Sequence, residues 1–98
     1  VTAVDAAKRR YRKANIGPRV DFAAPGVDVL VAAKRGNAYR SGTSYASAVA
    51  AGIIAQELAN RPASRDQIIT RLRQRAEDLG PAGRDAQFGW GLIRADGC

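Results

Sequence analysis

Histidine and methionine are absent from this 98-residue sequence, and cysteine occurs once, as Cys98. Because there is no imidazole, the chain by itself lacks the side chain that most often serves as a general base near neutral pH. A single Cys cannot form an internal disulfide, and no ligand spacing typical of a metal site is present. We therefore expect neither a disulfide framework nor a metal site within these residues.

Large apolar side chains are also scarce. The hydrophobic fraction is 46%, but Ala supplies 20 residues, while Val, Ile, Leu and Phe together supply another 20. Such a chain has difficulty burying a core of its own, although it suits close packing against neighbouring elements. Since the sequence also starts inside a strand pattern, we expect residues 1–98 to be a processed or excised part of a larger domain. A small Ala-rich fold that is stable alone is the alternative.

No apolar run is long enough for a signal peptide or a membrane span, so we expect no membrane partner. The net charge is +7, and five basic residues lie between Lys8 and Lys13. A basic run can attract phosphate or an anionic surface. It is more often a solvated loop, and here only Tyr11 interrupts it and no nucleic-acid-binding motif accompanies it. Nucleic-acid binding, which would weaken steeply with salt, is therefore a minor alternative.

Hydrophobic patterning predicts an α/β chain. Three short runs rich in Val, Phe and Ala are predicted as strands: Val1–Asp5, Arg19–Ala24 and Val27–Ala33. Lys34–Thr43 is predicted as a loop with two Gly residues, and Phe88–Asp96 as a closing extended segment. The chain lacks the regular βαβ repeat of a complete doubly wound domain.

Two helices are predicted in the second half of the chain. From Ser44 to about Ala59, small apolar residues surround the whole helix, which is typical of a buried helix. Gly52 inside it costs about 1 kcal/mol relative to Ala and indicates another backbone packed close by. Ser64 followed by Gln67 is a capping box that opens a surface helix running to about Asp78.

The stretch YRSGTSYASAVAAG places Ser44 where a flexible turn becomes a helix. Backbone N–H groups at a helix start lack partners, and the helix dipole is positive there. The Ser44 hydroxyl could cap that end, which is worth about 1 kcal/mol. The same geometry suits acyl transfer, since an oxyanion formed by attack of Ser44 Oγ on a carbonyl would lie beside the Ser44 N–H. These residues alone leave both interpretations open, the cap being the commoner one.

A longer comparison favours the second interpretation. The segment SGTSYASAVAAG resembles the nucleophile segment of subtilisin-like serine peptidases, where a Gly-Thr-Ser run opens a long helix. The preceding stretch VTAVDAAKRRYRKANIGPRVDFAAPGVDVL resembles the family segment just upstream, with Ala24, Pro25 and Gly26 matching its turn. FGWGLIRAD resembles the closing segment of the family. These blocks follow the order of the family and span nearly the whole chain.

The resemblance implies a C-terminal part of a subtilisin-like parallel-sheet domain and a role for each matching residue. Ser44 matches the nucleophile, Thr43 and Gly42 match the residues that shape the oxyanion hole and the nucleophile turn, and Tyr45 matches the leaving-group side of the cleft. In the family the triad Asp, the triad His and the oxyanion amide lie upstream of this segment. The parent is therefore expected to be a serine endopeptidase with a Ser-His-Asp mechanism, and the isolated chain to be inactive.

The resemblance also bears on partners and compartment. The implied partners are a peptide or protein substrate and the remainder of the peptidase domain, in a secreted or periplasmic protein. No cofactor is predicted: calcium occurs in the family, but no carboxylate cluster supports a calcium site here. Exposed apolar faces would lead the isolated chain to self-associate.

The sequence departs from the family pattern at two positions. The family usually has Pro where this chain has Ala48 and often has His where it has Val49. Ala48 should relax the first helical turn slightly and shift Ser44. A non-catalytic relative used for binding or scaffolding is the alternative that this departure favours, while the retained Gly-Thr-Ser argues against it. Nothing in the spacing supports Lys34 or Lys13 as a substitute base.

Overall fold

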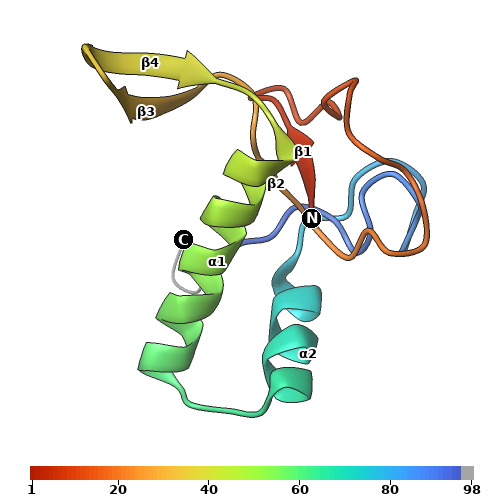
Figure 1. Cartoon of the computed structure of the whole chain (residues 1–98). Helices are drawn as coiled ribbons and strands as arrows, with labels where there is room; N and C mark the ends of the chain where they lie inside the picture. Colours follow the sequence, from red (N-terminus) through yellow and green to blue (C-terminus); the bar gives the residue numbers. More distant parts are fainter. Residues whose placement is uncertain (96–98) are drawn as a thin grey trace.

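The computed structural model describes residues 1–95 (Figure 1). Its elements are β1 (Thr2–Val4), β2 (Ala23–Pro25), β3 (Val29–Ala33), β4 (Gly36–Arg40), α1 (Thr43–Asn60) and α2 (Arg65–Arg75). The α/β class is confirmed. Cys98 and the last residue of the predicted closing segment, Asp96, lie outside the described residues. Within residues 1–95, neither helix combines the length and apolarity needed to cross a bilayer.

The sheet beneath α1 is built from strands distant in sequence. β1 and β2 are parallel, with Thr2 opposite Ala23. The closing segment lies along the other edge of β2, because the Ala23 N–H donates to Gly91 O (2.8 Å) and the Ile93 N–H donates to Ala23 O (2.8 Å). The predicted second strand begins late, since a turn in which the Val20 N–H donates to Gly17 O precedes it. The predicted closing extended segment is thus confirmed around Leu92, where it pairs with β2, whereas its first three residues, 88–90, belong to turns.

Small side chains bring α1 directly onto this sheet. Ala3 of β1 and Ala24 of β2 are fully buried, as are Ala46 and Ala50 of α1. Methyl groups on both surfaces let the helix backbone approach the strands closely at native packing density. The abundance of Ala in the sequence is therefore partly explained by this one contact.

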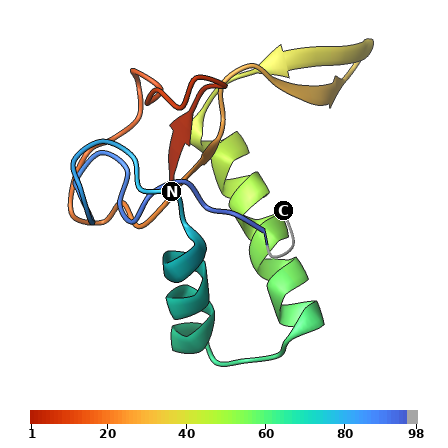
Figure 2. The ribbon, with the colours of Figure 1, turned by 180° about the vertical axis from the view of Figure 1, so that it is seen from behind.

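The prediction that α1 is buried on all sides holds for one face only. Its buried residues are Ala46, Ala50 and Glu57, and the face that carries Ala48, Ala51 and Ala55 is exposed. The reason is that β1, β2 and α2 all contact the same side of the helix (Figures 1 and 2). The backbone neighbour expected at Gly52 is absent from the described residues, because a Cβ built there meets nothing within 4 Å.

The predicted loop Lys34–Thr43 contains a strand. Residues 36–40 form β4, which pairs antiparallel with β3, with Ala33 opposite Gly36 at one end and Val29 opposite Arg40 at the other. Lys34 and Arg35 make the connection, and Gly36 adopts a φ of 89° after it. The hairpin is separate from the parallel sheet and projects away from the helices in both views (Figures 1 and 2).

The capping box of the second helix is confirmed. The Gln67 N–H donates to Ser64 Oγ (3.3 Å), and the Ser64 N–H donates to Gln67 Oε1 (3.0 Å). The helix ends at Arg75 rather than near Asp78. It ends early because Glu77 pairs with the closing segment, exchanging two backbone hydrogen bonds of 2.8 and 3.0 Å with Leu92.

A buried carboxylate joins the two helices. Glu57 on α1 has a side chain only 2% exposed, and its carboxylate accepts hydrogen bonds from Arg75 at 2.8 and 3.4 Å. Arg71 lies 3.5 Å from the same carboxylate. The hydrogen bond from Arg75 holds the pKa of Glu57 below its ordinary value of 4.5, with both arginine charges adding to the effect and outweighing the desolvation that would raise it. Two arginines of the surface helix α2 thus contact a carboxylate that is buried on α1.

We expect this cluster to make stability sensitive to acid. Since the folded pKa of Glu57 is lowered, its contribution is full above the unfolded pKa near 4.5 and is lost as the pH falls through the folded pKa. Glu57→Gln should lower the free energy of unfolding at neutral pH, because two arginines lose their carboxylate. It should also flatten the decline of stability between neutral and acidic pH, measured by urea unfolding.

The matched control for this experiment is Glu77→Gln. It removes the same charge from a half-exposed ion pair, that of Glu77 with Lys8 (2.8 Å). Exposed pairs contribute about 0–1 kcal/mol, so the control should lose less stability at neutral pH. Equal losses in the two variants would contradict a special role for the buried carboxylate.

Candidate active site

Ser44 is the second residue of α1, and its side chain is exposed. The N-cap residue is Gly42, and no side-chain hydrogen bond caps the helix. The interpretation of Ser44 as a helix cap is therefore wrong for this structure. Its hydroxyl lies on the exposed first turn of the helix and makes no capping hydrogen bond. Helix capping therefore does not account for a Ser at this position.

The turn before Ser44 depends on Gly42. Its φ of 155° and ψ of 160° form a backbone conformation that residues with a side chain rarely adopt. The Gly42 carbonyl accepts hydrogen bonds from the N–H groups of Tyr45 (3.2 Å) and Ala46 (3.3 Å), which closes the first turn of α1. Gly42 thus aligns the start of the helix and leaves no side chain in front of Ser44.

The same turn is held from behind by the sheet. The Gly42 N–H donates to Gly26 O (2.8 Å), and the Gly26 N–H donates to Val4 O (3.1 Å). A Cβ built on Gly26 would lie 2.6 Å from Ala3 Cβ, 2.9 Å from Ala46 Cβ and 2.9 Å from Gly42 O. Gly26 is therefore the point at which β1, α1 and the Ser44 turn meet, and no larger residue fits there.

The electrostatics of this end favour an anion next to Ser44. The N–H groups of Thr43 and Ser44 precede the first donors of the helix, Tyr45 and Ala46, so helix geometry provides them with no intrahelical acceptor. The first turn carries no acidic side chain. The positive end of the helix dipole is thus not neutralised by a carboxylate within α1. This arrangement can stabilise an oxyanion that forms on an atom attached to Ser44 Oγ.

The other predicted site residues lie around this turn, as their adjacency in sequence requires. Thr43 and Tyr45 are half-buried, and the Tyr45 ring lies beside Gly42, its Cδ2 3.6 Å from a Cβ built there. Ser41 was not predicted, yet its Oγ accepts a hydrogen bond from the Asp28 N–H (2.9 Å) and so joins the hairpin base to the turn. The only sequence signal for Ser41 is its place before the Gly-Thr-Ser run.

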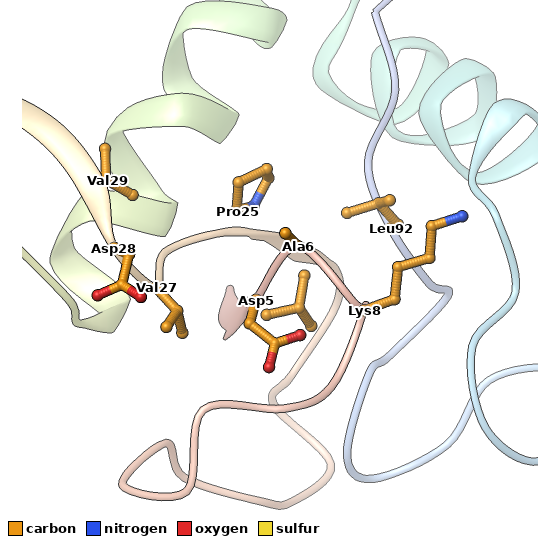
Figure 3. Close-up of a pocket in the computed structure, with 9 residues that line it drawn as sticks. Asp5, Ala6, Lys8, Pro25, Val27, Asp28, Val29 and Leu92 are labelled. Carbon is orange, nitrogen blue, oxygen red and sulfur yellow. The ribbon is translucent and has the colours of Figure 1, made fainter.

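A pocket of about 380 Å³ opens near the carboxyl ends of β1 and β2 (Figure 3). Asp28 and Val29 line it on the hairpin side, and Lys8 and Leu92 on the other. Ser44 does not line this pocket. The sequence offered no signal for it, because its walls come from three separated segments.

Asp5 also lines this pocket, but its carboxylate accepts hydrogen bonds from the loop that follows it. The Arg9 N–H donates to the Asp5 carboxylate, and this bond, together with the Arg9 charge and the Ala7 N–H, holds the pKa of Asp5 below its ordinary value. The Arg9 guanidinium adds a contact of 3.0 Å. Asp5 therefore orders the basic loop that follows β1.

The described residues offer no base beside Ser44. Lys34 lies at the tip of the hairpin, whereas Ser44 follows its base, and a strand of five residues spans about 16 Å. Lys13 lies in the loop between β1 and β2. No group of three or more His, Cys, Asp or Glu side chains within residues 1–95 is arranged to hold a metal ion.

Known proteins resemble this chain in sequence and in fold. The chain is 37% identical over 99 residues to the minor extracellular protease Epr of Bacillus subtilis (strain 168), covering 96% of this chain and 15% of the relative. It is 35% identical over 98 residues to the halolysin-like extracellular serine protease Nep of Natrialba magadii, covering 98% of this chain and 18% of the relative.

A solved structure gives the same result. MycP1 from Mycobacterium smegmatis superimposes with a TM-score of 0.82 at 25% identity, covering 94% of this chain and 27% of that chain. The predicted subtilisin-like fold is thereby confirmed. This chain spans less than a third of each of these three proteins. The sequence model of the subtilase family matches residues 1–91, so the chain belongs to the subtilase family.

Proposed function

We propose that this chain is the C-terminal part of the catalytic domain of a secreted serine endopeptidase, and that Ser44 is its nucleophile. The observation that carries the proposal is an exposed, uncapped Ser44 on the first turn of α1, within a match to the subtilase family over residues 1–91. Secretion is proposed because two relatives are named as extracellular proteases. The rest of the domain, the triad Asp and His included, belongs to the remainder of the parent polypeptide.

The chain supplies two parts of the mechanism. Ser44 Oγ attacks the carbonyl carbon of the scissile peptide bond while a base outside this chain takes its proton. The carbonyl oxygen becomes an oxyanion, and the N–H of Ser44 at the positive helix end stabilises it. The amine then leaves with a proton from the same base, and water hydrolyses the acyl-enzyme. Tyr45 borders the space in which the leaving amine departs.

The proposal predicts a difference between the chain and its parent polypeptide. A fluorophosphonate should modify Ser44 in the complete polypeptide, forming the Oγ–P bond and releasing fluoride, with the proton passing to the base. The isolated 98-residue chain has no His to act as that base and should remain unmodified. Mass spectrometry of tryptic peptides locates the adduct. A complete polypeptide that is folded but unmodified at Ser44 would support the non-catalytic binding or scaffold alternative instead.

A further inference from the structure

A residue in an unusual backbone conformation at the base of the β3–β4 hairpin is held by a serine side chain. Asp28, the residue just before β3, has a φ of 54°, in the left-handed region that residues other than glycine seldom adopt. Its N–H donates to Ser41 Oγ (2.9 Å), 13 positions later in the sequence. Conformations of this kind persist where surrounding contacts fix them, and they cluster at functional sites. The contact with Ser41 is therefore a candidate for a functional role.

Ser41 lies between the hairpin and the helix that carries the candidate nucleophile. The last pair of the β3–β4 ladder is Val29 with Arg40, so Asp28 and Ser41 are the next residues outward on the two strands. The helix α1 begins two residues after Ser41 (Figure 1). The Ser41 hydroxyl thus joins the two ends of the hairpin at the point where the chain leaves it for the nucleophile turn.

Two neighbouring hydrogen bonds attach this turn to the same short segment. Ser41 Oγ accepts from the Asp28 N–H, and the Gly42 N–H donates to Gly26 O (2.8 Å). The Gly42 carbonyl accepts from the first helical N–H groups and so carries the orientation of the turn into α1. A segment attached at two points keeps its orientation, whereas a segment attached at one point can rotate about it. Without the Ser41 bond, the Gly42 bond becomes a pivot for the turn that carries Ser44.

We infer that Ser41 is a positioning residue for Ser44. By holding the Asp28 N–H, its hydroxyl fixes the orientation of the turn, and with it the direction of Ser44 Oγ and of the Ser44 N–H. The inference rests on the proposed peptidase function, because Ser41 acts through the turn and not on the substrate. Orientation of a reacting group affects the chemical step, so loss of the bond should lower kcat and leave KM nearly unchanged.

The first test compares Ser41→Ala with Ser41→Thr in the complete polypeptide, with kcat and KM measured on a short peptide. Displacing a reacting group by about 1 Å can cost on the order of 10² in rate, and one lost hydrogen bond should displace it less. Ser41→Ala should therefore lower kcat about tenfold and keep KM within about twofold. Ser41→Thr keeps a hydroxyl on the same carbon and should restore kcat to within about threefold of the unaltered protein.

Ser47→Ala is the matched control, since it removes a hydroxyl from a serine just beyond the turn. It should keep kcat within about twofold. A Ser41→Ala variant with the same kcat as Ser47→Ala overturns the inference. A raised KM at unchanged kcat also overturns it, because that result indicates a contact with the substrate. So does a loss of kcat that threonine does not restore.

The second test measures the turn without any cleavage. Backbone hydrogen exchange, followed by mass spectrometry, is compared for residues 26–30 and 41–46 of the complete polypeptide. Ser41→Ala should speed exchange in both segments about tenfold relative to Ser47→Ala, because the two segments lose a hydrogen bond that joins them. Equal exchange in the two variants overturns the positioning role. If the unaltered polypeptide cleaves no peptide, the peptidase function fails, and hydrogen exchange still decides whether Ser41 holds the turn.

Discussion

Replacing Ser44 by Ala in the complete polypeptide is expected to abolish peptide hydrolysis while leaving the fold intact. Removal of the nucleophile is known to lower kcat of subtilisin, a member of the same family, by on the order of 10⁶, and we carry over that known magnitude. The fold should persist because Ser44 is exposed and makes no capping bond, and Ala favours the helix slightly. The measurements are kcat/KM on a short peptide and the thermal unfolding midpoint.

Ser47→Ala is the matched control for this experiment. Ser47 is also an exposed serine of α1, three residues further along the helix. It should retain kcat/KM within about twofold, since it lies outside the turn that aligns Ser44. A Ser44→Ala variant that keeps more than a trace of Ser47→Ala activity would remove Ser44 from the role of nucleophile.

The second large effect is expected from Gly26→Ala. The added methyl would collide with Ala3 Cβ at 2.6 Å and with Gly42 O at 2.9 Å, so β1 or the Ser44 turn has to shift. Overpacking of this kind costs about 1–3 kcal/mol. Misplacing a reacting group by about 1 Å can cost on the order of 10² in rate, and we expect kcat/KM to fall by about that factor. Urea unfolding and peptide hydrolysis measure the two losses.

Gly52→Ala provides the comparison, since a Cβ there meets nothing within 4 Å in the described residues. In the isolated chain it should raise helix stability by about 1 kcal/mol. The two variants add the same methyl group, at Gly26 where neighbouring atoms leave no room for it and at Gly52 where the space is open. If Gly26→Ala were as stable and active as the unaltered protein, the junction would not position Ser44.

Local patterns in the sequence predicted those features whose partners lie close together in the chain. The capping box needs only Ser64 and Gln67, three residues apart, and both of its hydrogen bonds form. The start of α1 followed from the change from a Gly-containing turn to an uninterrupted run of small residues. The candidate nucleophile Ser44 was found in the same way, because Gly-Thr-Ser and the helix after it are contiguous.

Features that depend on distant partners could not be read from these patterns. The burial of Glu57 is one such feature, since only the docking of α2 places Arg75, 18 residues later, against its carboxylate. The two Gly residues of Lys34–Thr43 predict a loop, and residues 36–40 become the strand β4 only because they pair with β3. How much of α1 is buried likewise depends on which elements pack against it, and here these are β1, β2 and α2.

The sequence by itself determined the family resemblance, the α/β class, both helices and the position of Ser44, because each rests on local patterns and on their order along the chain. Tertiary structure alone decided that Gly42 and not Ser44 caps α1, and that Gly26 has no room for a methyl group. It also decided that the hairpin stands apart from the sheet. The physical reason is that folding brings distant residues together. Only then is it fixed how much room a side chain has and which backbone groups remain unpaired.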